Sequence, residues 1–486
     1  MSAPARGALA IVLHTHMPYV EGFGTWPFGE EWLWEAIASC YLPLADLLDG
    51  GAPLTLSLTP VLCDQLEARR DPGRFERFVE DVRGATHEQD AAGLRSGGHE
   101  QLARELDRAY GDYTGALESL RRRGGELLAA LAPHAQWTSS ATHAILPLLA
   151  SDAGVRLQVH GGIESHRRRF GGHWRGGFWL PECAYAPSLG RALEDAGVAA
   201  VCVELTDVLG LGAPAHLRPL LSDAGVLLVP IDRATISLVW SDRGYPAAGA
   251  YRDYHHHTVH HHNPWNNAGD PYDADAALAL ARSHAADFVA RTRARLERCA
   301  AEAQPAPGAP LAVCALDTEL LGHWWYEGIA WLEAVVQECA RQDLELVRLD
   351  DALERVEPAA TDSLRTADPS AGLADWPASS WGHDGDLSTW SGPAVAEMAF
   401  AARRAELQLL GAGAGAGAAA VRELLALQAS DWAFMVSREI AAPYAHERHD
   451  GHRLAFEAAL DAGPRAGTER LRNLAADADR ALLLAP

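Results

Sequence analysis

Residues 177–185 read Gly-Phe-Trp-Leu-Pro-Glu-Cys-Ala-Tyr, an apolar run that ends on a single carboxylate among aromatic residues. Such a run predicts a buried strand that carries an acid at its far end. In α/β barrels the chemistry is carried by residues at the carboxyl ends of the strands. Glu182 is therefore the first candidate catalytic residue.

A second apolar run, Ala-Val-Cys-Ala-Leu-Asp at residues 312–317, also ends on an acid, Asp317, and Thr-Glu-Leu-Leu-Gly-His-Trp-Trp follows it. Two strand-end carboxylates suit glycosidic bond cleavage. In that reaction one acid protonates the leaving oxygen while the other attacks or stabilises the oxocarbenium-like centre. Tryptophan and tyrosine supply flat faces for sugar rings, and the chain contains 15 Trp. One strand-end acid alone would indicate an ion pair, but two in the same aromatic setting favour catalysis.

The composition excludes several classes of function. The chain has 486 residues and 65 acidic against 41 basic side chains, a formal charge of -24, which argues against binding nucleic acid or anionic membranes through a basic surface. Its seven cysteines are scattered and never spaced Cys-x-x-Cys, so we expect reduced thiols and a cytoplasmic protein. The first apolar run, residues 8–13, is too short for a signal peptide or a membrane span.

Short apolar, β-branched runs recur along the chain, and helical segments separate most of them, which is the pattern of parallel βα units. The predicted strands are residues 8–13, 54–59, 137–140, 155–160, 177–182, 199–204, 226–231, 311–317 and 344–349. We expect an α/β barrel-like catalytic domain over residues 1–393. A helical insertion is expected at about residues 64–133, where apolar residues recur at helical spacing.

No strand signal remains after residue 394. Residues 395–410, 421–436 and 468–484 have the pattern of amphipathic helices, and the repeat Gly-Ala-Gly-Ala-Gly-Ala-Gly at 411–417 separates the first two. We therefore expect a C-terminal all-helical domain over residues 394–486. Its apolar stripes indicate packing surfaces rather than binding faces.

Two histidines, His14 and His16, follow the first predicted strand, and alternation places both imidazoles on the same side of an extended chain. Because neutral imidazole is a common metal ligand, this pair allows a metal-dependent hydrolase of the amidohydrolase type as an alternative. The tract His-His-His-Thr-Val-His-His-His at 255–262 could also bind divalent ions. Its turn-like Tyr, Pro and Gly flanks favour a solvated loop, and its role stays open.

Five segments resemble, in order, the signature regions of glycoside hydrolase family 57. They are HTHMPYV at 14–20, WPFGEEW at 26–32, TH at 142–143, WLPECAY at 179–185 and DTELLGHWWYEG at 317–328. Three further pieces are similar to the 1,4-α-glucan branching enzymes of that family: SSWG at 379–382, Trp390, and SDWAFM at 430–435.

The resemblance implies an incomplete (β/α)7 barrel and a retaining double displacement through a glycosyl-enzyme intermediate, with no metal and no cofactor in the chemistry. By position, Glu182 corresponds to the nucleophile and Asp317 to the general acid/base, and retention predicts carboxyl groups about 5 to 5.5 Å apart. The substrate would be an α-1,4-glucan such as amylose or glycogen. The substrate-binding positions implied are His14, His16, Trp26, Trp32, His143, Tyr245, His323, Trp325, Trp381, Trp390, Asp431 and Trp432.

Within that set, the resemblance assigns the three histidines to the donor sugar and Tyr245 to a flexible loop that covers the cleft. One segment departs from the family pattern. Between residues 254 and 271 the family carries a longer stretch with an acceptor-side aromatic, whereas this chain is short and His-rich there, and Trp265 is a candidate substitute. Four alternatives therefore stay open: an α-amylase, a 4-α-glucanotransferase, the metal-dependent hydrolase, and a catalytically idle glycan-binding protein.

Overall fold

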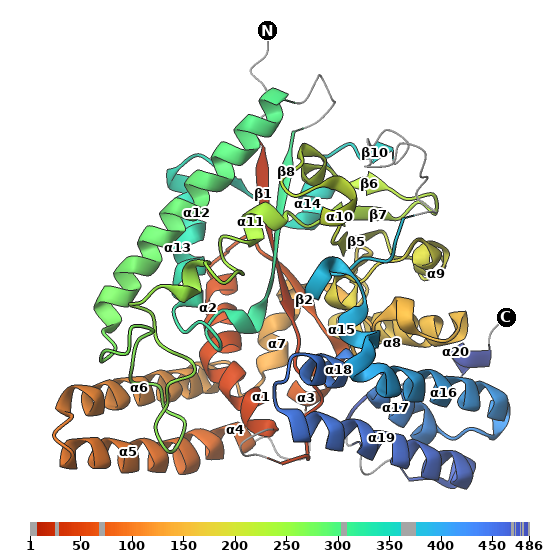
Figure 1. Ribbon diagram of the computed structural model, residues 1–486, viewed down its shortest axis with the longest axis horizontal. Helices are drawn as coiled ribbons and strands as arrows, with labels where there is room; N and C mark the ends of the chain where they lie inside the picture. Colours follow the sequence, from red (N-terminus) through yellow and green to blue (C-terminus); the bar gives the residue numbers. More distant parts are fainter. Residues whose placement is uncertain are drawn as a thin grey trace.

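The computed structural model describes residues 7–24, 29–67, 73–302, 309–360, 376–467, 471, 473–476, 478 and 481–484. Its centre is one curled sheet with the strand order β10-β6-β7-β5-β4-β3-β2-β1-β8, and β9 pairs with β1 (Figure 1). The strands are β1 (Ala8–Thr15), β2 (Thr55–Leu58), β3 (Ala135–Ser139), β4 (Gly177–Trp179), β5 (Ala200–Val203), β6 (Leu220–Leu221), β7 (Leu227–Pro230), β8 (Leu311–Asp317), β9 (Glu345–Leu346) and β10 (Ala359–Ala360).

Seven parallel strands, β1 to β5 with β7 and β8, form the barrel, while β6 pairs antiparallel with β7. Across the gap between β7 and β8, the backbone N–H of Asp232 donates to the carbonyl of Val313 at 2.8 Å. Arg295, from the long outer helix, adds two hydrogen bonds of 2.7 Å to the buried Asp232 carboxylate. The sheet therefore nearly closes, and the incomplete (β/α)7 barrel is confirmed.

The strand register brings the predicted catalytic elements to one edge of the barrel. His14 of β1 pairs with Asp317 of β8 on one side and with Ser57 of β2 on the other. Ser139 of β3 pairs with Trp179, the last residue of β4. Since these pairs all lie at the carboxyl ends of parallel strands, the side chains that follow them converge on one site.

Helices cover the outside of the barrel, and α12 and α13 pack together along one side (Figure 1). The covering helices are α1 (Glu30–Ala36), α2 (Leu42–Asp49), α8 (Asp152–Phe170), α9 (Gly190–Asp195), α10 (Thr206–Leu209), α11 (Arg233–Ile236), α12 (Ala274–Glu302), α13 (Gly328–Arg341) and α14 (Leu349–Leu353).

The strand predicted at residues 155–160 is wrong, because the segment lies inside α8. Its alternating pattern arose because both faces of this helix are covered. Gln158 is 0% exposed and bonds Thr142 on the barrel side and Gln428 on the C-terminal side. The strand predicted at 344–349 shrinks to the two residues of β9.

The predicted insertion is helical and projects beside the barrel, where α5 and α6 form an antiparallel pair (Figure 1). A backbone of π-helical geometry, residues Phe78–Arg83, leads into α5. The helices of this region are α3 (Pro60–Leu66), α4 (Arg74–Arg77), α5 (Gly84–Ser96), α6 (Glu100–Arg122) and α7 (Leu127–Leu131).

The described part of the C-terminal region is also helical and packs on the opposite side of the barrel base from α5 and α6 (Figure 1). Its helices are α15 (Ser388–Ser391), α16 (Ala396–Ala412), α17 (Ala418–Leu427), α18 (Ser430–Ser437), α19 (Ala442–Ala462) and α20 (Ala481–Leu484). The helix predicted at 421–436 is divided between α17 and α18, and α19 was not predicted.

The helix predicted at residues 468–484 is confirmed only at Ala481–Leu484 among the described residues of that range. Residue 471 is 3-10 helical, and residues 473–476 and 478 lie in turns or irregular backbone. Among all the helices described, none is long and apolar enough to cross a membrane.

Candidate active site

Glu182 lies just past the end of β4 in an unusual backbone conformation. It has φ 59° and ψ 24°, and Cys183 after it has φ 50°, so two consecutive side-chain-bearing residues are left-handed. Each costs about 1–3 kcal/mol and persists only where the surroundings impose it. Here Cys183 N donates to the Leu180 carbonyl at 2.8 Å, and the Glu182 carbonyl accepts from Trp381 N at 2.9 Å. Such strain is concentrated at functional sites, and here it fixes the direction of the Glu182 side chain.

The Glu182 carboxylate is held by aromatic and imidazole nitrogens. Trp381 Nε1 donates to Oε2 at 2.7 Å, and His143 Nδ1 lies 3.8 Å from Oε1. Burial raises the pKa of Glu182 to about 7, while the Trp381 hydrogen bond and the His16 charge act in the opposite direction. Glu182 is therefore able to ionise near neutral pH.

Asp317 ends β8, where it pairs with His14 of β1, and its carboxyl group has no hydrogen-bond partner among the described residues. Burial, followed by the negative charges of Glu182 and Glu319, raises its pKa well above the usual range. Two neighbouring carboxyl groups whose pKa values are pushed apart can act as an acid and a base in one site. The raised pKa of Asp317 favours its protonated form, which is the form a general acid needs.

Glu319 is a third buried carboxyl group at this edge. Its Oε1 accepts from the Tyr41 hydroxyl at 2.6 Å and from the His16 backbone N–H at 3.1 Å. Burial raises the pKa of Glu319 to about 7, against the lowering effect of the Tyr41 hydrogen bond. This side chain fixes the end of β1 relative to β8.

Three imidazoles form a stack beside the acids. His14 Nε2 and His143 Nε2 are 2.9 Å apart, and the His16 and His143 rings stack with centroids 3.9 Å apart. Trp179 stacks on the other face of His14 at 4.5 Å. Burial and the charge of His16 lower the pKa values of His14 and His143 well below the usual range. These two rings are neutral and present hydrogen-bonding nitrogens rather than charge.

His16 differs from the other two because Asp431 accepts a hydrogen bond from its Nε2 at 2.8 Å. Although burial lowers its pKa, the charge and hydrogen bond of Asp431 raise the pKa of His16 above the usual value. Ser430, next to Asp431 on α18, lies 2.8 Å from His143 Nδ1 through its hydroxyl. The C-terminal helices therefore supply partners for two of the three histidines.

Among the described residues, one group could hold a cation: His16, His143 and Asp431 have ligand atoms within 4.8 Å of one another. Its two imidazoles are nearly parallel, with 17° between the planes, and His16 Nε2 already donates to Asp431. Nitrogens of stacked rings point in similar directions instead of converging on one point. The donor set fits a hydrogen-bonded stack better than a tetrahedral metal site.

Two family models match this chain. The model of glycosyl hydrolase family 57 matches residues 137–365, and the model of the 1,4-alpha-glucan branching enzyme C-terminal region matches residues 394–479. A 1,4-alpha-glucan branching enzyme of Thermococcus kodakarensis is 30% identical over 93% of this chain and 74% of its own length. A probable 1,4-alpha-glucan branching enzyme of Mycobacterium tuberculosis is 30% identical over 97% of this chain and 95% of its own. The chain belongs to glycosyl hydrolase family 57.

A solved structure agrees with this assignment. The crystal structure of a family 57 branching enzyme from Pyrococcus horikoshii superimposes with a TM-score of 0.87 at 27% identity, over 98% of this chain and 96% of that one. The fold likeness therefore extends over the barrel, the insertion and the C-terminal helices alike.

The structure brings seven of the predicted site residues of this family 57 chain together at the carboxyl edge of the barrel. They are His14, His16, His143, Glu182, Asp317, Trp381 and Asp431. Trp32 and His323 line a cavity of about 790 Å³ whose lining contains none of these seven residues. Trp26 lies outside the described residues.

Tyr245 is attached to the outer helices. Its hydroxyl donates to Asp287 of α12 at 2.7 Å, and its ring stacks on His284 at 4.6 Å. The role of Tyr245 as a cover over the cleft stays a prediction, and it would require these contacts to open.

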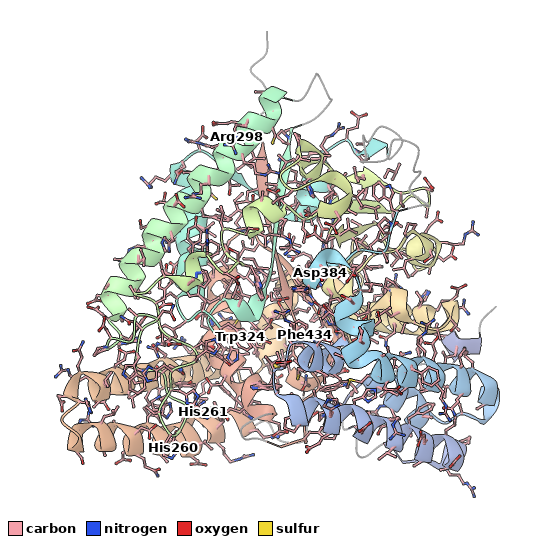
Figure 2. All side chains as sticks on the ribbon, in the orientation of Figure 1. His260, His261, Arg298, Trp324, Asp384 and Phe434 are labelled. Carbon is pink, nitrogen blue, oxygen red and sulfur yellow. The ribbon has the colours of Figure 1, made fainter. Side chains whose placement is uncertain are left out.

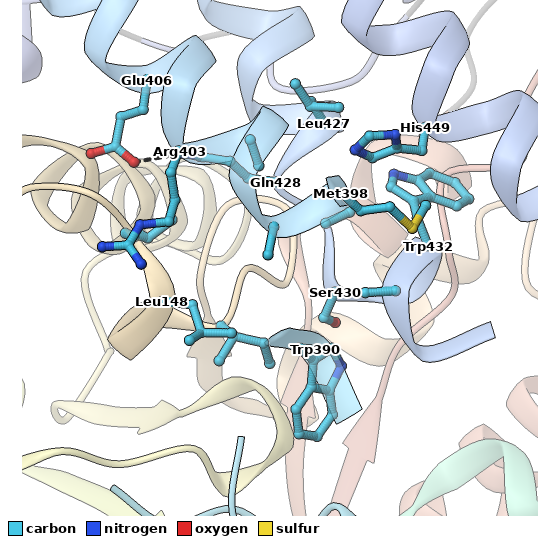
Figure 3. A pocket seen from close by; sticks show the side chains of 16 residues that line it. Leu148, Trp390, Met398, Arg403, Glu406, Leu427, Gln428, Ser430, Trp432 and His449 are labelled. Carbon is cyan, nitrogen blue, oxygen red and sulfur yellow. Dashed lines mark hydrogen bonds between the residues drawn. The ribbon is translucent and has the colours of Figure 1, made fainter. Parts of the chain in front are cut away.

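Three predicted tryptophans are buried. Trp325, Trp390 and Trp432 are 1%, 2% and 1% exposed. Figure 3 shows Trp390 and Trp432 on the wall of a small cavity near Ser430, whose volume of about 60 Å³ has room for about two water molecules and not for a sugar ring. This placement does not support direct stacking on substrate by these three side chains.

Two residues of the site were not predicted from the sequence. Glu319 was named only as a neighbour of Asp317. Ser430 is the first residue of α18, and a serine at the start of a helix usually indicates a cap. The available signal for Glu319 was its spacing two residues after Asp317, because both side chains of an extended segment then lie on one side.

Proposed function

We propose that the protein is a 1,4-α-glucan branching enzyme, which cuts an α-1,4 bond and rejoins the fragment through an α-1,6 bond. The observation that carries the proposal is the carboxyl pair, in which burial places the pKa of Glu182 at about 7 and that of Asp317 well above its usual range. The branching enzymes similar over nearly the whole chain support the reaction assigned to this pair.

In the proposed mechanism Asp317 gives its proton to the glycosidic oxygen while the Glu182 carboxylate attacks the anomeric carbon. The bond to the leaving glucan breaks, and a glycosyl ester forms on Glu182. A 6-hydroxyl of an acceptor glucan then attacks this ester and returns its proton to Asp317, which releases the Glu182 carboxylate. The configuration at the anomeric carbon is retained through two inversions.

We assign the neutral His14 and His143 to the hydroxyl groups of the donor sugar, because their pKa values are lowered and their nitrogens lie at the carboxyl pair. His16, whose pKa Asp431 raises, favours the ionised form of Glu182. Trp381 positions the nucleophile through its indole N–H. The separation of 5 to 5.5 Å between the carboxyl groups stays a prediction.

The cytoplasm is the proposed location. All seven cysteines are buried free thiols, which is the usual state in a reducing compartment. The proposed partner is a neutral α-1,4-glucan, and the net charge of -24 supports no affinity for nucleic acid. The division into a barrel domain at 1–393 and a helical domain at 394–486 remains part of the proposal.

The test is incubation of the protein with amylose, followed by enzymatic debranching and chain-length analysis. New side chains released by debranching are the expected result, and Glu182→Gln is the matched control that should make none. Reducing sugar alone would identify an α-amylase, and redistributed linear chains a 4-α-glucanotransferase. Activity that is lost on exhaustive chelation and restored by a divalent ion would favour the metal-dependent hydrolase.

A further inference from the structure

A large cavity lies between the loop that follows β8 and the helical insertion, and it is separate from the small one near Ser430. Its volume is about 790 Å³, within the range of sites that bind small ligands. Its walls come from α1, α2, α6, the His-rich segment and the loop after β8. That loop continues directly from Asp317, and Trp324 N donates to the Glu319 carbonyl at 3.1 Å. One wall of the cavity therefore belongs to the loop that continues from Asp317, and the cavity extends toward the helical insertion.

The chemistry of the walls fits a neutral polyhydroxyl ligand. Five carboxylates and four guanidinium groups line the cavity, so the charges nearly cancel. Several of them pair with each other, as in the contacts of Arg83 with Glu31 and Glu35. Arg83, Arg108 and Arg252 are each paired with a carboxylate, so most of the positive charge is compensated. Paired charged groups offer many hydrogen-bonding atoms to hydroxyls.

An aromatic platform is exposed in this cavity. The Trp324 ring is 46% exposed and rests on Tyr254, with centroids 4.4 Å apart, while His323 meets it edge-on at 5.5 Å. Figure 2 shows Trp324 near the middle of the molecule, between the sheet and the α5–α6 pair. A ring fixed on one side by a tyrosine and open on the other is suited to stacking against a sugar.

The His-rich segment forms part of the cavity wall and is fixed to the helical insertion. His260 Nδ1 lies 2.6 Å from Asp90 Oδ1 on α5, and Thr258 donates to the same carboxylate. His262 packs against His87 of α5, with ring centroids 3.7 Å apart and the planes tilted by 40°. Figure 2 shows His260 and His261 over α5 and α6. The His-rich segment therefore forms a wall of the cavity that is held in place by contacts with the helical insertion.

We propose that this cavity binds the acceptor glucan and that Trp324 is the stacking residue that seats it beside the glycosyl-enzyme intermediate. The inference rests on the proposed branching activity. The proposal assigns a function to the short, His-rich segment. Its contacts with Asp90 on α5 hold the segment against the insertion, where it forms a wall of the cavity that contains Trp324. A glucan seated there excludes water from the intermediate and favours transfer over hydrolysis.

The test supplies amylose as donor and a maltooligosaccharide with a labelled, blocked reducing end as a separate acceptor. For Trp324→Ala we expect the acceptor KM to rise roughly twofold to tenfold, the range of one aromatic contact. Hydrolysis per bond cleaved should rise while the rate of donor cleavage stays the same. Trp324→Phe should restore most of the transfer. Phe400→Ala is the matched control, because Phe400 is 63% exposed on α16 and does not line the cavity.

An unchanged acceptor KM in Trp324→Ala would overturn the inference, and so would an equal loss of donor cleavage and transfer, which would place Trp324 on the donor side. If the wild type makes no branches, the proposed function fails on its own. The cavity is then tested by calorimetric binding of maltoheptaose to Glu182→Gln and to Glu182→Gln/Trp324→Ala. Equal affinities would refute glucan binding there, and weaker binding by the double variant would support it.

Discussion

Replacing Trp381 by phenylalanine isolates one hydrogen bond at the proposed nucleophile. The indole Nε1 donates to Glu182 Oε2 at 2.7 Å, and this bond is the largest influence that counteracts the effect of burial on the Glu182 pKa. Phenylalanine keeps an aromatic ring against Trp179, where the two indoles meet edge-on at 5.2 Å. The main loss is therefore a donor that stabilises the ionised carboxylate.

The sign and size of the effect follow from the contact. A hydrogen bond to a charged group contributes about 1.5–3 kcal/mol, and 1.36 kcal/mol corresponds to one pH unit. Because water can replace part of the lost bond, we expect the Glu182 pKa to rise by about one pH unit from its value of about 7. The fraction of Glu182 that is ionised at pH 7 then falls by roughly fivefold.

The assay is the pH dependence of kcat/KM for amylose cleavage, whose acid limb reports ionisation of the nucleophile in the unliganded enzyme. Trp381→Phe should move this limb to higher pH. Trp376→Phe is the control, since that indole is buried five residues away and its N–H has no partner among the described residues. An acid limb that stays in place in Trp381→Phe, with activity reduced equally at every pH, would refute the reasoning.

Three further changes test other parts of the structure. Glu182→Gln and Asp317→Asn should each lower amylose cleavage by roughly 10³-fold or more with an unchanged circular dichroism spectrum, and activity near the wild-type level in either would contradict the assigned pair. Asp232→Ala leaves a buried guanidinium group unpaired next to the barrel closure, so urea unfolding should show a loss of about 3–5 kcal/mol, and a loss below about 1 kcal/mol would speak against it. Asp431→Asn removes the negative charge that raises the pKa of His16. The His16 charge lowers the pKa of Glu182 by more than the Asp431 charge raises it, so losing both should raise the Glu182 pKa. The acid limb of this variant should therefore also move to higher pH, and a shift to lower pH would disprove this coupling.

Most strands could be predicted because parallel strands buried on both faces appear as continuous apolar runs. The two acids were found for the same reason, since each ends such a run. The run at 155–160 failed because a helix packed on two sides can carry strand-like alternation, and Gln158 shows how a polar residue becomes fully buried there. Strands β6 and β10, two residues each, are too short to give any periodic signal.

The shape of the site was harder to predict than its members. Nothing in local sequence indicates that Glu182 and Cys183 adopt left-handed backbone, because glycine is the usual residue for that conformation. Trp325, Trp390 and Trp432 matched family positions, yet tertiary packing buries all three. Spacing in sequence fixes which residues are near one edge, but packing decides which faces are open.

The C-terminal helices act on the chemistry as well as on the packing. Asp431 raises the pKa of His16 on the barrel, and the resulting positive charge favours ionisation of Glu182. Ser430 orients His143, whose Nδ1 lies 3.8 Å from the same carboxylate. A barrel without these helices would still contain both acids but would lack the partner that raises the pKa of His16. Ionisation of the nucleophile thus depends on residues that lie more than 240 positions after Glu182 in the chain. The apolar stripes of these helices therefore gave no indication that the helices influence the active site.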